Sequence, residues 1–180
     1  MKIYTKTGDG GDTGLQGNLR ISKSHPRIMA YGAVDEANSS IGVVLAGDTN
    51  GEIRDALIRI QNELFVVGSD LSNPNMNDMK NRVTTEMIRG LESYIDTFDL
   101  ELLPLGSFIL PGGSLEASLI HRARTVTRRA ETLTVLLSEH DEINSNCIKY
   151  LNRLSDLLFV MGRLANKKKG IKDVPWIPDS

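Results

Sequence analysis

Apolar residues repeat every three or four positions along most of this chain, and that spacing restricts the fold more than any other feature. The clearest run lies between Glu52 and Leu71, at Ile53, Leu57, Ile60, Leu64, Val67 and Leu71. Residues at this spacing fall on one side of a helix with 3.6 residues per turn. We therefore predict an amphipathic helix here, with its apolar side against a core.

Four further segments have helical character and recognisable ends. Pro26 is a helix-start signal, Ser114 is a good N-cap, and Gly170 after three lysines is a stop signal. The other helices are expected at about 28–45, 84–98, 115–139 and 142–168. Five long helices joined by short links predict an all-α fold, a five-helix antiparallel bundle.

Size and charge limit the remaining possibilities. A chain of 180 residues is expected to form one domain, divided into an N-terminal segment (1–25), a bundle (26–169) and a C-terminal tail (170–180). The net charge of −2 gives no general attraction to nucleic acid or to anionic membranes. No apolar run has the length of a membrane span, and no signal peptide is recognisable, which favours a cytoplasmic protein or a mature organelle protein.

The segment YTKTGDGGDTGL at 4–15 is the first candidate site. It is not a Walker A loop, because Lys6 precedes the glycines, and Thr13 stands where a dinucleotide fingerprint has its last glycine. Small residues leave the backbone amides open to an anion, and Lys6 and Lys23 add charge. Hydroxyl groups flank the glycines at Thr5, Thr7 and Thr13. The segment is interpreted as a phosphate-binding loop or, alternatively, as a flexible terminus.

The segment HRARTVTRRAE at 121–131 gathers positive charge within a predicted helix. At 100° per residue, one side of that helix carries His121, Arg124, Arg128 and Glu131. Arginine forks match phosphate oxygens, and Glu131 can hold one guanidinium in position. A receptor for a polyanion is therefore favoured, and an ordinary solvated helix face is the alternative.

Other polar residues interrupt apolar patterns. Asn152 and Asp156 are expected in a helix–helix seam, where they must be hydrogen-bonded or line a site, and Asp35 would need an arginine partner if buried. No glutamate is followed by histidine three residues later, and the three histidines form no zinc motif. Cys147 is the only cysteine, so no intrachain disulfide and no thiolate metal cluster can form, and no protein metal ligand is assigned.

Four motifs together resemble one family. MKIYTKTGDGG at the start, FILPGG at 108–113, ART with RRAE at 123–131, and LNRLSDLLF at 151–159 are similar to the PduO-type ATP:cob(I)alamin adenosyltransferases. The resemblance covers nearly the whole chain. It implies a ferritin-like, cobalamin adenosyltransferase-like bundle with an ordered glycine-rich N-terminal loop, assembled as a homotrimer with active sites between subunits.

The activity implied is transfer of the 5′-deoxyadenosyl group of ATP to cobalt in reduced cobalamin, with Mg²⁺, releasing triphosphate. A cobalamin reductase and a B12-dependent acceptor enzyme are the further partners that such an activity would need. The resemblance assigns nucleotide binding to Thr5, Lys6, Thr7, Gly8, Thr13, Gly14, Lys23, Arg128, Arg129, Glu131 and Asn152.

The same resemblance implies roles for the catalytic set, which is Arg124, Arg128, Asp35 and Phe108. Arg124 would pair with Asp35 of a neighbouring subunit, and Phe108 would sit against the corrin face. Trp176 would belong to a mobile C-terminal segment. Two positions depart from the family pattern, since Thr132 replaces a common arginine and Arg122 a common apolar residue.

The residues are chemically consistent with this reaction. Cobalt(I) is already a strong nucleophile, so the protein needs to align the reactants, neutralise triphosphate and exclude water, without a catalytic base. Two alternatives stay open. One is an ATP- and corrinoid-binding sensor or cofactor-delivery bundle without turnover, and the other is a structural bundle with a disordered glycine-rich start.

Overall fold

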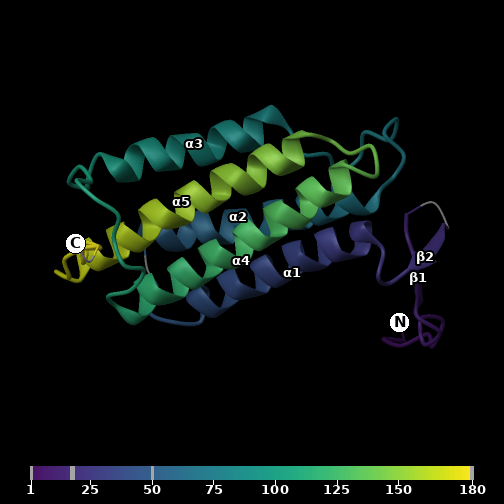
Figure 1. Cartoon of the computed structure of the whole chain (residues 1–180), viewed down its shortest axis with the longest axis horizontal. Helices are drawn as coiled ribbons and strands as arrows, with labels where there is room; N and C mark the ends of the chain where they lie inside the picture. Colours follow the sequence, from purple (N-terminus) through teal and green to yellow (C-terminus); the bar gives the residue numbers. More distant parts are fainter. Residues whose placement is uncertain (1, 17–18, 50, 179–180) are drawn as a thin grey trace.

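The computed structural model describes residues 2–16, 19–49 and 51–178, and this part of the chain forms a bundle of five helices. The helices are α1 (Pro26–Leu45), α2 (Gly51–Ser72), α3 (Thr85–Asp99), α4 (Leu115–Ser138) and α5 (Asn146–Lys168). Consecutive helices alternate in direction, which confirms the predicted antiparallel bundle (Figure 1). One end of the bundle carries the N-terminal segment, and the other carries the tail. We call these the N-terminal end and the C-terminal end.

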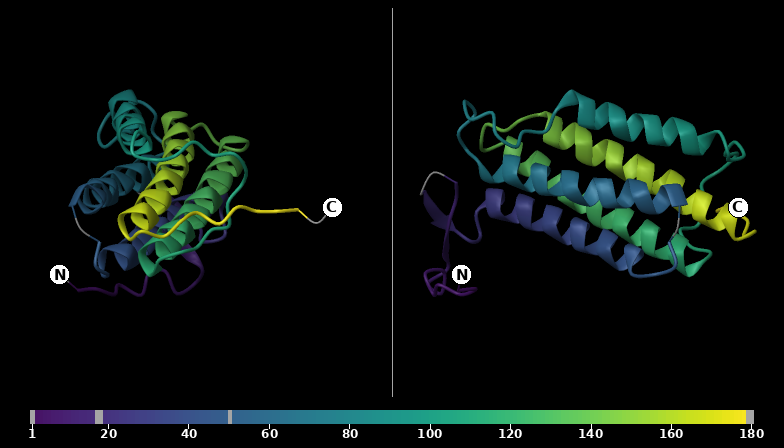
Figure 2. Two further views of the ribbon diagram at one scale, coloured as in Figure 1. Left: turned by 90° about the vertical axis from the view of Figure 1, so that its left-hand side faces the viewer. Right: turned by 180° about the vertical axis from the view of Figure 1, so that it is seen from behind.

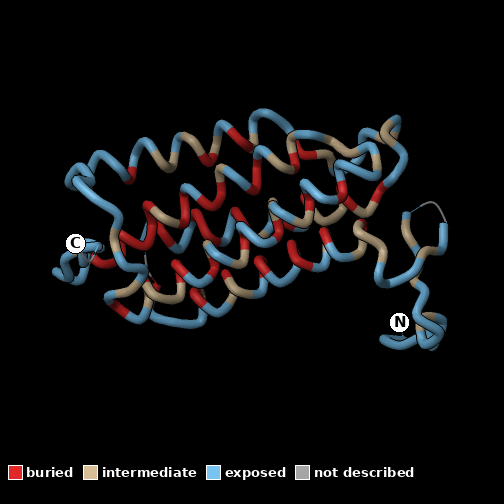
Figure 3. Tube along the Cα trace, in the orientation of Figure 1, coloured by how far each residue is buried: buried red, intermediate tan, exposed pale blue. Residues whose placement is uncertain are grey.

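A short hairpin precedes the bundle and was not anticipated from the sequence. Its strands are β1 (Asp12–Gly14) and β2 (Arg20–Ser22), which pair antiparallel with Thr13 opposite Ile21. The hairpin and the residues before it lie beyond the N-terminal end of the helices and are largely exposed (Figures 1 and 3).

Local capping explains where the helices begin and end. The Ser114 hydroxyl accepts a hydrogen bond from the Ala117 amide at 3.1 Å, which confirms the predicted N-cap of α4. His25 caps α1 by accepting from the Arg27 amide through Nδ1. Gly170 adopts a φ of 68°, and its amide bonds the Lys167 carbonyl while the next amide bonds Asn166, forming a Schellman motif after α5.

The predicted start of the fifth helix at Glu142 is wrong, because α5 begins at Asn146. The Asn144 side chain has other partners: its amide donates to Asp70 Oδ2 at 2.7 Å and to the Val83 carbonyl at 2.9 Å. Its Oδ1 accepts from the Asn146 amide at 3.1 Å. Non-helical backbone before Asn146 is what allows this one side chain to bridge three segments.

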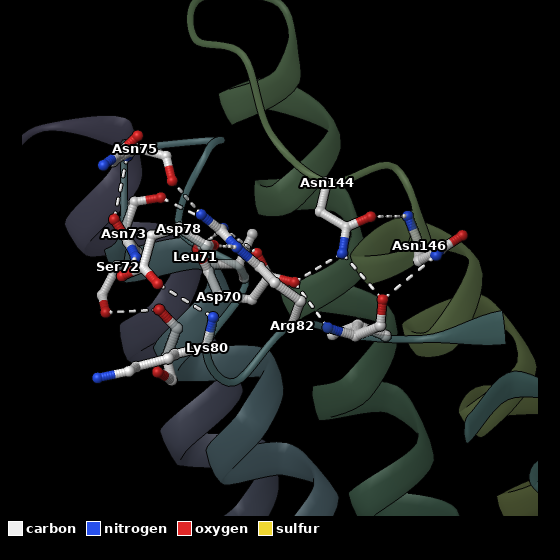
Figure 4. Close-up of polar contacts among 12 residues, drawn as sticks. Asp70, Leu71, Ser72, Asn73, Asn75, Asp78, Lys80, Arg82, Asn144 and Asn146 are labelled. Carbon is white, nitrogen blue, oxygen red and sulfur yellow. Dashed lines mark hydrogen bonds and ion pairs between the residues drawn. The ribbon is translucent and has the colours of Figure 1, made fainter. Parts of the chain in front are cut away.

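Asp70 is the centre of a polar network at the N-terminal end (Figure 4). It is 2% exposed, pairs with Arg82, and accepts from the Val83 amide at 2.8 Å. A buried carboxylate is stable only when it is paired and hydrogen-bonded in this way. The network joins the end of α2, the 73–84 link and the start of α5.

The core is centred on α5, which packs against α4, α3 and α2 (Figure 2). Between Leu157 and Asn166, every residue except Phe159 is buried (Figure 3). Two of these buried residues, Arg163 and Asn166, are polar and need partners outside the helix.

Asn166 explains the glycines of the FILPGG motif. Its Oδ1 accepts from the Ser114 amide at 2.8 Å, and its Nδ2 donates to the Gly112 carbonyl at 2.8 Å. Gly113 has a φ of 108°, and a Cβ there would collide with the Asn166 side-chain amide. Glycine is required at 113 both by the backbone conformation and by the closeness of α5.

We expect Gly113→Ala to lower the free energy of unfolding by about 3 kcal/mol, from left-handed strain and displaced Asn166 hydrogen bonds. Gly170→Ala is the matched control, since Gly170 also has positive φ but nothing lies within 4 Å of the Cβ that alanine would add there. It should cost about 1 kcal/mol. Urea denaturation measures both values, and equal losses would contradict the role given to Asn166.

Candidate nucleotide and corrinoid site

Side chains of the N-terminal segment hold the glycine-rich loop in shape. Arg20 of β2 donates through Nη2 to the Thr7 carbonyl at 2.6 Å and to the Asp12 carbonyl at 3.3 Å. The Thr5 and Thr7 hydroxyls lie 2.8 Å apart, and Lys6 between them has a φ of 61°. A left-handed lysine is an unusual conformation that this loop maintains. These contacts give the loop a defined conformation, with the Thr5 and Thr7 hydroxyls side by side.

Lys23 joins this loop, as the sequence predicted. Its amide donates to the Gly11 carbonyl at 2.8 Å, and its Nζ lies near Gly8, where a Cβ would be 3.2 Å from that nitrogen. The Lys23 ammonium therefore borders Gly8, whereas that of Lys6 lies over the Tyr4 ring, 5.8 Å from its centroid. This geometry suits an anion that approaches the backbone closely.

Gln16 anchors the hairpin to the bundle, and sequence reasoning missed it. Its Nε2 donates to the Ser72 hydroxyl at 3.0 Å and to the Ser69 hydroxyl at 3.2 Å, both on α2. A hollow of about 400 Å³ lies beside this contact, and Gly14 and Asp35 both line it. A glutamine in a turn gives no sequence signal, because its partner is far away along the chain.

The arginine-rich part of α4, from His121 to Glu131, makes one polar contact with α1 and one with α5. Arg129 forms an ion pair with Glu36 of α1, and both side chains are about half exposed. Asn152 of α5 donates to Glu131 Oε1 at 3.0 Å. The structure thus brings Glu131 and Asn152 together. We call the exposed surface around Arg124, Arg128, Arg129, Glu131 and Asn152 the arginine ridge.

Two arginines of the ridge lack acceptors. Arg124 Nε is buried without a hydrogen-bond partner, and the Arg128 guanidinium makes no ion pair with any residue that the structure describes. Burial lowers the pKa of Arg124 below its ordinary value, and the charge of Arg128 lowers it further. An unpaired, partly desolvated guanidinium next to a second one is a strong receptor for an anion.

The predicted site residues do not all meet within one chain. Asp35 is exposed on α1, and within the described residues it forms no ion pair with Arg124. The glycine-rich loop lies beyond the N-terminal end, whereas the ridge lies along the middle of α4 (Figure 1). Phe108 lies near the opposite end and is 80% exposed. Its ring is edge-on to that of Trp176, with 6.4 Å between the ring centroids.

One sequence interpretation is wrong. Asp156 is not in a helix–helix seam but on an exposed face, where Arg153 Nη1 contacts its Oδ2 at 2.9 Å. Asn152, on the same exposed face of α5, is also exposed, although it bonds Glu131. The helical spacing correctly predicted that the two residues share one face of α5. It did not predict that this face is exposed.

Two kinds of feature are absent from the described residues. No three or more His, Cys, Asp or Glu side chains converge there into a group that could hold a metal ion. None of the described helices combines the length and apolar character needed to cross a bilayer.

The described residues thus form a five-helix bundle with a structured glycine-rich N-terminal loop and, on α4, a ridge in which Arg124 and Arg128 lack carboxylate partners. The cobalamin adenosyltransferase family model matches residues 3–165. The corrinoid adenosyltransferase of Mycobacterium leprae is 46% identical, over 98% of this chain and 96% of that protein. The corrinoid adenosyltransferase of Bacillus subtilis is 45% identical, over 98% of this chain and 92% of that protein. The chain belongs to the cobalamin adenosyltransferase family.

Solved structures agree with this assignment. A variant of the PduO-type ATP:corrinoid adenosyltransferase from Lactobacillus reuteri, complexed with cobalamin and ATP, superposes with a TM-score of 0.91 at 37% identity. The match covers 98% of this chain and 100% of that one. Another variant of that enzyme, complexed with ATP, gives a TM-score of 0.90.

We expect Arg20→Ala to loosen the glycine-rich loop, because two backbone carbonyls lose their donor. Limited trypsin digestion should cut after Lys6 several-fold faster, because cleavage follows local opening, while the thermal midpoint of the bundle stays the same. Arg54→Ala is the control, since Arg54 also donates to a backbone carbonyl, that of Leu45, but outside the loop. Unchanged cleavage after Lys6 would contradict the role given to Arg20.

Proposed function

We propose that this adenosyltransferase joins the 5′-deoxyadenosyl group of ATP to cobalt(I) of a reduced corrinoid, in sites built by neighbouring copies of the chain. The cobalt–carbon bond forms as the bond between C5′ and the triphosphate oxygen breaks, and triphosphate leaves with the electron pair. Two arginines of the ridge carry the proposal: Arg124 Nε is buried without an acceptor, and the charge of Arg128 acts on it.

The N-terminal loop is proposed to bind the triphosphate. Thr5 and Thr7 supply hydroxyls, Lys6 and Lys23 supply charge, and Gly8 allows close backbone approach. Gly14 of β1 lines one hollow with Asp35 and extends this surface toward α1. Thr13, the residue before it in β1, is proposed to bind the nucleotide with it. Magnesium is proposed to arrive as MgATP, bound through phosphate oxygens, the ligand type that it prefers.

The ridge is proposed to hold the leaving group and the nucleoside. Arg128 and Arg129 neutralise charge that develops on triphosphate as it departs, which acts on the transition state more than on bound ATP. Glu131 and Asn152, already bonded to each other, present one fixed polar edge to the nucleoside.

A second copy of the chain is needed to complete this site. The loop lies beyond the end of its own bundle, so one triphosphate cannot touch the loop and the ridge of the same described chain in this conformation (Figure 1). A homotrimer, in which each loop reaches the next copy's ridge and Asp35 pairs with Arg124, satisfies both groups. Closed rotational symmetry gives every copy the same contact.

Anaerobic incubation with MgATP and cob(I)alamin tests the activity directly. We expect the absorbance of adenosylcobalamin to appear, with one triphosphate released per product. Binding of both ligands without that product would instead support a sensor or cofactor-delivery protein. A cytoplasmic location stays a prediction.

We expect Arg128→Ala to lower kcat/KM by about 100-fold or more, because a donor acting on the departing phosphate is lost. Arg128→Lys should retain an intermediate rate, since lysine keeps the charge but not the fork. Arg122→Ala, an exposed arginine on the same helix, is the control and should stay within about twofold of wild type. Circular dichroism checks that all three variants remain folded, and a fully active Arg128→Ala would refute the role of Arg128.

A mixing experiment tests the shared site. Lys6→Ala disables the loop and Arg128→Ala the ridge, so each variant alone should be inactive. When the two are refolded together in equal amounts, random assembly pairs an intact loop with an intact ridge in about a quarter of sites. Activity should recover to that level. No recovery from mixed oligomers would show that loop and ridge of one chain work together.

A further inference from the structure

We infer that Arg163 and Asp173 form a clasp that positions Phe108, and that they are positioning residues for the corrinoid half of the site. The inference rests on the proposed function, and on the position against the corrin face that the family resemblance implies for Phe108. It concerns the C-terminal half of α5 and the tail, and no residue there has a role in the proposed nucleotide binding.

Arg163 holds two separate segments at the C-terminal end. Its Nε donates to Asp173 Oδ2 at 2.8 Å, at the start of the tail. Its Nη2 donates to the Leu103 carbonyl at 2.7 Å, in the connection between α3 and α4. One guanidinium therefore fixes the tail and the 103–110 connection relative to α5.

Directly beyond the clasp, these two segments pair with each other. The Leu110 amide donates to the Val174 carbonyl at 2.8 Å, and the Trp176 amide donates to the Phe108 carbonyl at 2.7 Å. Ile109 and Pro175 form an antiparallel bridge between these bonds. The Phe108 and Trp176 rings lie edge to face.

Packing alone does not fix this paired unit. Phe108 is 80% exposed and Trp176 is 50% exposed, so neither ring is held in the core. The connection and the tail together border a hollow of about 730 Å³, with Arg163 among its lining residues. Because neither exposed ring fastens these segments to α5, the polar clasp carries much of the attachment.

The clasp is placed where a charge pair is strong. The Arg163 side chain is 6% exposed and that of Asp173 is 23% exposed. The other carboxylate near Arg163, Asp99, is 3.9 Å from Nη1 and 64% exposed. Removing the Asp173 charge leaves a buried guanidinium with one carbonyl and a distant, solvated carboxylate. The tail should then detach from α5, and Phe108 should lose its fixed position.

Asp173→Asn tests the clasp, and Asp99→Asn is the matched control because it removes the weaker carboxylate around the same guanidinium. Trp176 is the only tryptophan in the chain, so its fluorescence reports tail position without any assay of activity. We expect Asp173→Asn to shift the Trp176 emission to longer wavelength and to raise its quenching by acrylamide. The KM for cob(I)alamin should rise about tenfold while the KM for ATP stays within about twofold. Arg163→Lys should give a smaller change in both readouts.

The outcomes separate this inference from the proposed function. Unchanged Trp176 fluorescence in Asp173→Asn would overturn the clasp, whatever the activity. Altered fluorescence with an unchanged corrinoid KM would overturn the positioning of Phe108. An equal rise in both KM values would also overturn it, because that result indicates a general structural role. A wild-type protein that forms no adenosylcobalamin would refute the proposed function. The Trp176 fluorescence of Asp173→Asn would still test the clasp in that case.

Discussion

The second half of α5 is buried on nearly every side, and the organisation of the C-terminal end follows from that burial. A helix surrounded in this way cannot leave a polar side chain unsatisfied. Asn166 therefore bonds the Gly112 carbonyl and the Ser114 amide, and Arg163 bonds Asp173 and the Leu103 carbonyl. These four bonds set the path of the chain between α3 and α4 and the first part of the tail. Phe108 is itself exposed, but its position depends on these bonds from buried residues of α5.

The N-terminal end is organised differently, with consequences for the site. The Asp70–Arg82 network secures the links between helices there, but it does not extend to the glycine-rich segment. That segment is attached through the turn at Gln16 and through β2, and none of its described apolar residues belongs to the core. Its internal bonds give it shape, whereas its position depends on little besides the Gln16 contacts. A loop of this kind is suited to close over a ligand together with another surface.

Sequence reasoning recovered what depends on local spacing and missed what depends on distant partners. The helices were predictable because their apolar residues repeat over many turns, and the caps at Ser114 and Gly170 because capping is local. The start of α5 was misplaced because Asn144 bonds Asp70 and Val83, which lie far away in sequence. The hairpin has only three residues per strand and no apolar alternation. Arg163 and Asn166 look like solvated helix positions until the burial of α5 is known. The glycine loop and the ridge were recognisable by composition, but their separation within one chain was not.

The reaction explains why positioning contacts matter more here than titrating groups. Cobalt(I) needs no base, so the rate depends on alignment with C5′ and on charge around the departing triphosphate. The chain divides these two requirements between different places. In the proposed site, the ridge in the middle of α4 and the loop at the N-terminal end bind triphosphate, whereas Phe108 lies at the C-terminal end, where the Arg163–Asp173 pair holds the tail. Because no hydrogen bond among the described residues links the clasp to the ridge, separate sets of contacts hold the proposed corrinoid and nucleotide parts of the site.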